Sequence, residues 1–148
     1  MSSAFALLFA GLLAGEELAI CLGIRPALAR FDAPLQIPLR QALIRRLRIL
    51  VPLLFFGAAL SGVVALHAAA WGNALGPRGA GLAALFAFLA VTLGGTVPIN
   101  KAALGWNPAA PPPGWRRQVR RWERLDVIRC WLALAAFALF LAAKQTAG

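Results

Sequence analysis

The chain has 148 residues, of which 61% are hydrophobic, and its mean hydropathy is +0.75. A soluble domain is about 45–50% apolar, and here the excess lies in long blocks, which excludes a soluble globular domain and indicates an integral membrane protein. The net charge of +10 comes from basic residues that cluster between the apolar blocks, so we expect them to meet anionic lipid headgroups rather than nucleic acid.

Four apolar segments predict the fold, because a hydrocarbon core of about 30 Å needs about 20 helical residues. The expected spans are residues 4–24, 49–70, 80–98 and 127–143, with the last helix beginning earlier, near Trp115. The predicted fold class is all-α: a single domain over residues 1–148, folded as an integral membrane four-helix bundle. Residues Leu39–Leu47 predict a basic interfacial helix that runs into the second span. The first segment lacks a basic start, so it is expected to be retained rather than cleaved as a signal peptide.

The charges of the connecting segments predict the orientation. Residues 25–48 hold six arginines, and residues 99–126 hold a lysine and five arginines, whereas the second loop and the C-terminal tail hold one basic residue each. Segments rich in Lys and Arg remain in the cytoplasm. Both basic loops are therefore expected to be cytoplasmic and both termini outside, in a bacterial inner membrane. Membrane lipids are the expected partners, and a lipophilic small molecule, a homo-oligomer or another membrane protein is left open.

Two adjacent carboxylates, Glu16 and Glu17, interrupt the first apolar segment. One such charge costs about 3 kcal/mol on insertion scales, so a charge within a span marks a functional candidate. The two side chains point about 100° apart on a helix, so at most one is expected to be central. We prefer Glu17 for that position, because Ala10, Ala14 and Cys21 share its face.

The third and fourth segments carry further polar residues at helical spacing. Thr92, Thr96 and Asn100 recur every four residues, which predicts either a kinked helix end with capping hydroxyls or the polar wall of a pocket. Alternating steps of four and three residues predict one stripe along the fourth helix: Trp115, Val119, Trp122, Asp126, Arg129 and Ala133. On this stripe Asp126 and Arg129 can form an ion pair, which would either stabilise the helix entry or line a pocket. All these groups fall in the half of the bundle nearest the basic loops.

A Pro-Ile-Asn turn lies within Thr96-Val-Pro-Ile-Asn-Lys-Ala-Ala-Leu-Gly-Trp106, and Trp122-Glu-Arg-Leu-Asp-Val-Ile-Arg129 follows, with Arg seven residues after Trp. This pattern resembles the anthrone oxygenase-like family of small four-helix membrane proteins, and the Arg25-Pro-Ala-Leu stretch is similar to its members as well. In one departure, Asp126 stands where we expect His or Asn from the family.

The resemblance implies an oxygenation that needs neither metal nor flavin. An anthrone loses a proton that its carbonyl group makes acidic, the carbanion reduces dioxygen, and a hydroperoxide collapses to the anthraquinone. Such chemistry needs a base, donors for the enolate oxygen and a flat apolar slot. The candidate catalytic residues are Asp126, Arg129, Glu17 and Asn100, and the candidate substrate-binding residues are Trp106, Trp122, Thr96 and Glu16. The motif supports Asn100, Trp122 and Arg129, whereas burial alone supports the glutamates. We expect no metal site and no cofactor.

Two other classes of protein remain open from the sequence. One is a non-catalytic membrane protein, either an accessory subunit of a larger complex or a binder of a lipid or quinone, in which the glutamates pair with basic groups of a partner or with Arg129. The other is an ion or proton pathway. Four spans with one carboxylate pair and no inverted repeat fit a transporter poorly.

Overall fold

The computed structural model describes residues 2–68 and 75–145, which are almost entirely helical and contain no β-strand. The elements in chain order are α1 (Ser2–Ala19), the π-helical turn η1 (Ile20–Ile24), α2 (Arg25–Leu28), α3 (Ala33–Ala68), α4 (Leu75–Val91), the π-helical turn η2 (Thr92–Thr96), α5 (Val97–Leu104) and α6 (Trp115–Gln145). The all-α prediction is confirmed. The fourth long helix begins at Trp115, as the sequence predicted.

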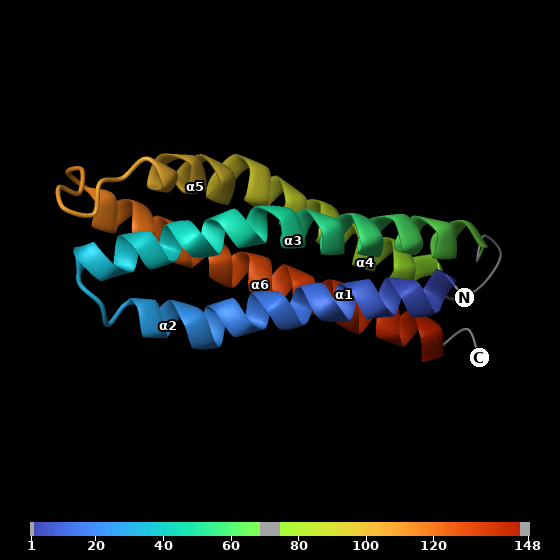
Figure 1. Ribbon diagram of the computed structural model, residues 1–148. Coiled ribbons are helices and arrows are strands. Elements are labelled where there is room, and N and C mark those ends of the chain that lie inside the picture. Colours follow the sequence, from blue (N-terminus) through green and yellow to red (C-terminus); the bar gives the residue numbers. More distant parts are fainter. Residues whose placement is uncertain (1, 69–74, 146–148) are drawn as a thin grey trace.

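The described elements form four rods, because η1 joins α1 to α2 and η2 joins α4 to α5 without a break. Each rod is long and apolar enough to cross a membrane. The rods lie side by side, with the start of α1 and the end of α6 near one end of the bundle and α2 and α5 toward the other (Figure 1). Contacts join α1 to α3, α3 to α4, α4 to α6 and α6 to α1, so the rods close into a ring. The protein is therefore an integral membrane four-helix bundle.

The helix α3 contains the basic stretch 39–47 and residues 49–68 of the second predicted span. The basic stretch is thus the first part of a continuous helix of 36 residues rather than a separate element. The expected end of the span at residue 70 lies outside the described residues.

Each π-helical turn comes just before a proline, Pro26 after η1 and Pro98 after η2. Proline has no N–H to donate, and its ring crowds the carbonyl group four residues earlier in an α-helix. A wider turn at this point accommodates both effects, and such π-bulges are frequent at functional sites. One of them begins three residues after Glu17, and the other ends at Thr96.

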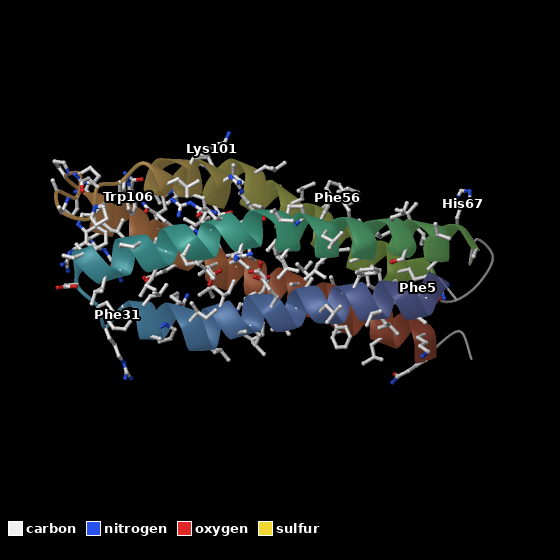
Figure 2. All side chains as sticks on the ribbon, in the orientation of Figure 1. Phe5, Phe31, Phe56, His67, Lys101 and Trp106 are labelled. Atoms are coloured by element: carbon white, nitrogen blue, oxygen red, sulfur yellow. The ribbon has the colours of Figure 1, made fainter. Side chains whose placement is uncertain are left out.

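The core divides into layers along the bundle. A large apolar cluster near the termini includes Leu13, Phe55 and Phe88. A second cluster of Ile20, Ile99 and Trp122 lies nearer the basic loops, and a third around Trp106 follows it. Since Glu17 lies between Leu13 and Ile20 in the chain, the carboxylates fall between the first and second clusters. In Figure 2, Trp106 lies at the end of the bundle opposite Phe5.

The exposed surface changes from basic to apolar at one level. On α3 the exposed arginines end at Arg48, and on α6 they end at Arg124. These positions lie at the same level, because their neighbours Leu47 and Leu125 pack against the same apolar cluster. The exposed His67 lies in the last turn of α3, and the large exposed residues between Arg48 and His67 are apolar: Ile49, Leu50, Leu53, Phe56, Leu60, Val63 and Val64. Such a surface suits lipid chains.

Candidate functional site

A cluster of charged side chains lies inside the bundle between the apolar layers. Glu17 comes from α1, Arg40 from α3, and Asp126 and Arg129 from α6, and all four are buried. Glu17 lies on the face of α1 that packs against α3 and α6, the same face as Ala10 and Leu13. Asp126 and Arg129 follow the predicted stripe of α6, of which Val119, Trp122 and Ala133 are also buried.

Arg129 occupies the centre of this cluster. Its Nη2 donates a hydrogen bond to Oε1 of Glu17, and the two side chains form a buried ion pair between α6 and α1. The guanidinium carbon of Arg129 also lies 4.8 Å from the ring centroid of Phe88 on α4. Arg129 interacts electrostatically with Glu16 and Asp126 as well. One guanidinium group therefore faces three carboxyl groups, and a third helix supplies the aromatic surface under it.

Two further arginines face Asp126. Nη1 of Arg25 lies 4.0 Å from Oδ2 of Asp126 and donates a hydrogen bond of 3.0 Å to the carbonyl oxygen of Glu123. Arg40 interacts electrostatically with Asp126, and its guanidinium carbon lies 4.8 Å from the ring centroid of Trp122. The cluster thus brings three arginines to three carboxyl groups, which balances its charge when all are ionised.

Arg25 and Arg40 were predicted as loop charges that set topology, Arg25 also within a stretch similar to the family and Arg40 within the basic helix, and neither was predicted to lie in the cluster. The signal for Arg40 was present in the sequence. It shares a helical face with Ile37, Ile44 and Val51, all of which are buried.

Many buried polar atoms of the cluster have no hydrogen-bond partner among the described residues. The acceptors are both carboxylate oxygens of Glu16, Oε2 of Glu17 and both oxygens of Asp126; the donors are Nε of Arg129, Nε and Nη2 of Arg40, and Nε1 of Trp122. Buried polar groups in native proteins are nearly all hydrogen-bonded. This arrangement can donate to one oxygen of a polar ligand and accept a proton from another of its atoms.

The structure brings Glu16, Glu17, Asp126, Arg129 and Trp122 together. Glu17 is the fully buried glutamate, in agreement with the sequence analysis. The carboxylate oxygens of Glu16 are buried as well, although the residue as a whole is only half-buried. Both glutamates therefore turn their charged ends inward, whereas the sequence analysis expected at most one to be central.

The other predicted site residues lie apart from this group. The hydroxyl group of Thr96 is buried and donates to the carbonyl oxygen of Thr92 at 3.1 Å, as expected for a hydroxyl that satisfies its own helix. Asn100 is half-buried on α5, and among the described residues no hydrogen bond or ion pair joins it to the cluster. Trp106 packs against Trp115, with ring centroids 6.1 Å apart, in a different apolar cluster from Trp122.

An open cleft of about 460 Å³ lies beside the cluster, between α2 and α6. It is lined by Arg25, Pro26, Ala29, Arg120, Glu123, Arg124 and Val127. Arg25 is therefore shared between the cleft and Asp126. Within residues 2–68 and 75–145, no group of three His, Cys, Asp or Glu side chains is placed to hold a metal ion.

The fold and the site define a small four-helix membrane protein with a buried cluster of carboxyl and guanidinium groups. A family model for anthrone oxygenase matches residues 41–139, more than half of the chain, and the chain belongs to this family. The resemblance found in the sequence is thus confirmed. The match includes Trp122, Asp126 and Arg129, whereas Glu16 and Glu17 precede it. No curated protein and no solved structure matches the chain.

Proposed function

We propose that the protein is a membrane-embedded oxygenase that acts on a lipophilic anthrone-like aromatic, with dioxygen as oxidant and without metal or flavin. The observation that carries this proposal is the set of buried donors and acceptors without partners around Asp126 and Arg129. Those of Trp122, Asp126 and Arg129 lie within the part of the chain that matches the family. A polycyclic ketone supplies what they lack, because its carbonyl oxygen accepts hydrogen bonds and its acidic C–H group can face a carboxylate.

The proposed reaction consumes one dioxygen for each anthrone. A carboxylate removes one proton from the methylene carbon opposite the carbonyl group, and the electron pair spreads onto the carbonyl oxygen as an enolate. The carbanion form reduces dioxygen and bonds to it at that carbon, and protonation gives the hydroperoxide. Loss of the second proton then breaks the O–O bond, so that a new carbonyl group forms and water leaves. The anthrone itself supplies all the electrons.

Each role falls to a side chain with an available atom. Asp126 is our candidate base, since both its oxygens are buried and accept no hydrogen bond from the described residues. Nε of Arg129 and Nε1 of Trp122 are the candidate donors to the enolate oxygen. Glu17 accepts a hydrogen bond from Nη2 of Arg129 and so positions its guanidinium group. Glu16 is the alternative base. Trp106 and Asn100 receive no role here, because they lie apart from these groups.

Oxygen uptake by the protein in lipid nanodiscs with anthrone as the probe tests this proposal. We expect one anthraquinone per dioxygen consumed, and a loss of at least about 100-fold in rate for Asp126→Asn, as is usual when a general base is removed. Arg129→Lys keeps the charge but loses the Nε donor, and we expect it to be slow as well. Arg121→Lys, an exposed position on the same helix, is the matched control.

Anthrone also oxidises without protein, so empty nanodiscs set the background. Uptake by the wild type at that background rate would contradict the oxygenase proposal. Uptake at the wild-type rate by a folded Asp126→Asn variant would leave the oxygenase proposal standing but overturn Asp126 as the base in favour of Glu16.

A non-catalytic membrane protein is the second candidate, and the Glu17–Arg129 pair favours it, since this pair already satisfies part of the cluster without a ligand. In that case the protein is an accessory subunit or a binder of a lipid or quinone. A stoichiometric partner chain or a tightly bound lipid that copurifies with the protein, together with background oxygen uptake, would support this class.

We also propose that the basic end of the bundle faces the cytoplasm and that both termini lie outside. The arginine-rich segments support this orientation, because such segments resist translocation. A reporter fused at the C-terminus that is active only after export is expected to be active. Activity of the matching cytoplasmic reporter in its place would reverse the orientation.

A further inference from the structure

The cleft between α2 and α6 is unusually basic for a surface that lies next to an apolar membrane face. Three arginines line it, Arg25 from α2 and Arg120 and Arg124 from α6, against the single carboxylate of Glu123. Arg120 and Arg124 are exposed and lie one turn apart, so both side chains reach the same side of α6. The cleft therefore presents a net positive charge to a ligand that enters from outside.

The cleft also lies at the level where a bilayer's headgroups are expected. At about 1.5 Å per residue, the 36 residues of α3 extend about 54 Å, well beyond a hydrocarbon core of about 30 Å. The bundle must therefore project from the hydrocarbon, and the exposed charges mark the projecting end. Those charges stop at Arg48 and Arg124, and Arg124 is itself a wall of the cleft.

Apolar residues continue from the cleft toward the lipid-facing side. Pro26 and Val127 are among the residues that line it. One turn beyond them on the same helical faces are Leu22 and Trp131, both 69% exposed. Two apolar surfaces therefore extend from the arginines toward the hydrocarbon region. Two acyl chains of a lipid would run in the same direction.

We propose that this cleft binds the phosphate headgroup of an anionic phospholipid from the surrounding bilayer. Arg25, Arg120 and Arg124 bind the phosphate oxygens, and the acyl chains lie along the faces of Leu22 and Trp131. Guanidinium groups suit this task because they offer paired N–H donors to phosphate. Basic recesses between spanning helices on the cytoplasmic side are a recurrent type of headgroup site.

Arg25 lies between the proposed lipid site and the buried cluster. The side chain is half-buried, with Nη1 4.0 Å from Oδ2 of Asp126, and it also lines the cleft. A phosphate bound in the cleft therefore shares this guanidinium group with Asp126. The proposal itself does not depend on oxygenase activity, since it concerns only the outer side of Arg25.

The test compares two double variants that remove the same charge from the same helix. Arg120→Ala/Arg124→Ala removes the outer arginines of the cleft, and Arg117→Ala/Arg121→Ala removes an equally spaced exposed pair that does not line it. Association of spin-labelled phosphatidylglycerol and phosphatidylcholine with each protein is measured in phosphatidylcholine bilayers. All four positions are exposed, so both variants are expected to fold, and helicity and gel filtration check this.

We expect the wild type to prefer phosphatidylglycerol and the Arg120→Ala/Arg124→Ala variant to lose about fivefold of that preference or more. The Arg117→Ala/Arg121→Ala variant keeps the preference to within about twofold. Excess inorganic phosphate is not expected to displace the bound phosphatidylglycerol, because the acyl chains anchor the lipid in the bilayer.

Equal losses in the two double variants would overturn the proposal, since the preference would then belong to the basic surface as a whole. Displacement of the lipid by inorganic phosphate would overturn it in favour of a site for free phosphate. An unchanged lipid preference in the Arg120→Ala/Arg124→Ala variant, with a raised KM for anthrone, would identify the cleft as a substrate entrance and would overturn the lipid site.

Discussion

Arg129 of α6 donates a buried hydrogen bond to Glu17 of α1, and this pair joins positions 112 residues apart in the chain. Removing one partner leaves the other charge buried and unpaired, which costs about 3–5 kcal/mol in comparable proteins. We expect Glu17→Leu and Arg129→Met each to lower the free energy of unfolding by such an amount. The double variant is expected to lose less than the sum, because neither member of the pair is left without the other. Reversible unfolding in mixed micelles measures all three.

An exposed arginine on the same helix provides the control for that cycle. Arg121→Met is expected to change the unfolding free energy by no more than about 0.5 kcal/mol. If the losses of the two single variants simply add in the double variant, the pair makes no specific contribution to the joining of α1 and α6.

Glu16 is expected to respond to substitution in the opposite way to Glu17. Its carboxylate oxygens are buried and accept no hydrogen bond from the described residues, and they lie near the negative groups of Glu17 and Asp126. Glu16→Gln removes a charge whose burial costs more than its attraction to Arg129 returns, and it keeps the shape of the side chain. We therefore expect the thermal unfolding midpoint to stay the same or rise, whereas Glu17→Gln lowers it. A large fall for Glu16→Gln would mean that Arg129 depends on Glu16 as much as on Glu17.

The sequence predicted the parts of the structure that depend on local periodicity. The three- and four-residue spacing along α6 predicted a stripe that includes Val119, Trp122, Asp126, Arg129 and Ala133, and each of these five is buried. The exposed arginines fall between them, as that spacing requires. A single helix carries this information, because each residue's face depends only on its position along the helix.

Contacts between helices were harder to predict. Arg129 had three acidic residues as possible partners, and its choice of Glu17 depends on how α1 packs beside α6. Arg25 and Arg40 were counted as loop charges, because a topology rule counts charges and ignores the face on which they lie. Arg40 points inward because it lies on the buried face of α3, and Arg25 directly follows the turn at η1, and neither feature enters a count of charges.

Gln41 is expected to stabilise the end of α5. Its Nε2 donates to the carbonyl oxygen of Ala103 at 2.9 Å, which also accepts from the Trp106 N–H group at 3.2 Å, and to the carbonyl oxygen of Trp106 at 3.0 Å, just beyond the helix end. Gln41→Ala leaves these acceptors without that donor, and we expect a loss of about 1–3 kcal/mol in the free energy of unfolding. Gln118→Ala, at another half-buried glutamine, is the control and is expected to change it little. Equal effects in both variants would show that Gln41 acts only through general packing.

Gly57 allows α3 to approach α1 at the ring of Phe9. A Cβ atom added at Gly57 would lie 2.6 Å from Cδ1 of that ring, which is too close for any side chain to occupy without movement. Gly57→Ala is therefore expected to destabilise the bundle by about 1–3 kcal/mol, the usual cost of overpacking. Gly15→Ala on α1 is the matched control, because an added Cβ there meets nothing within 4 Å, and alanine favours the helix more than glycine does. We expect a lower thermal midpoint for Gly57→Ala and an equal or higher one for Gly15→Ala. If Phe9→Ala restores the midpoint of Gly57→Ala, the contact between these two residues is the cause; if it does not, α3 and α1 do not meet at this position.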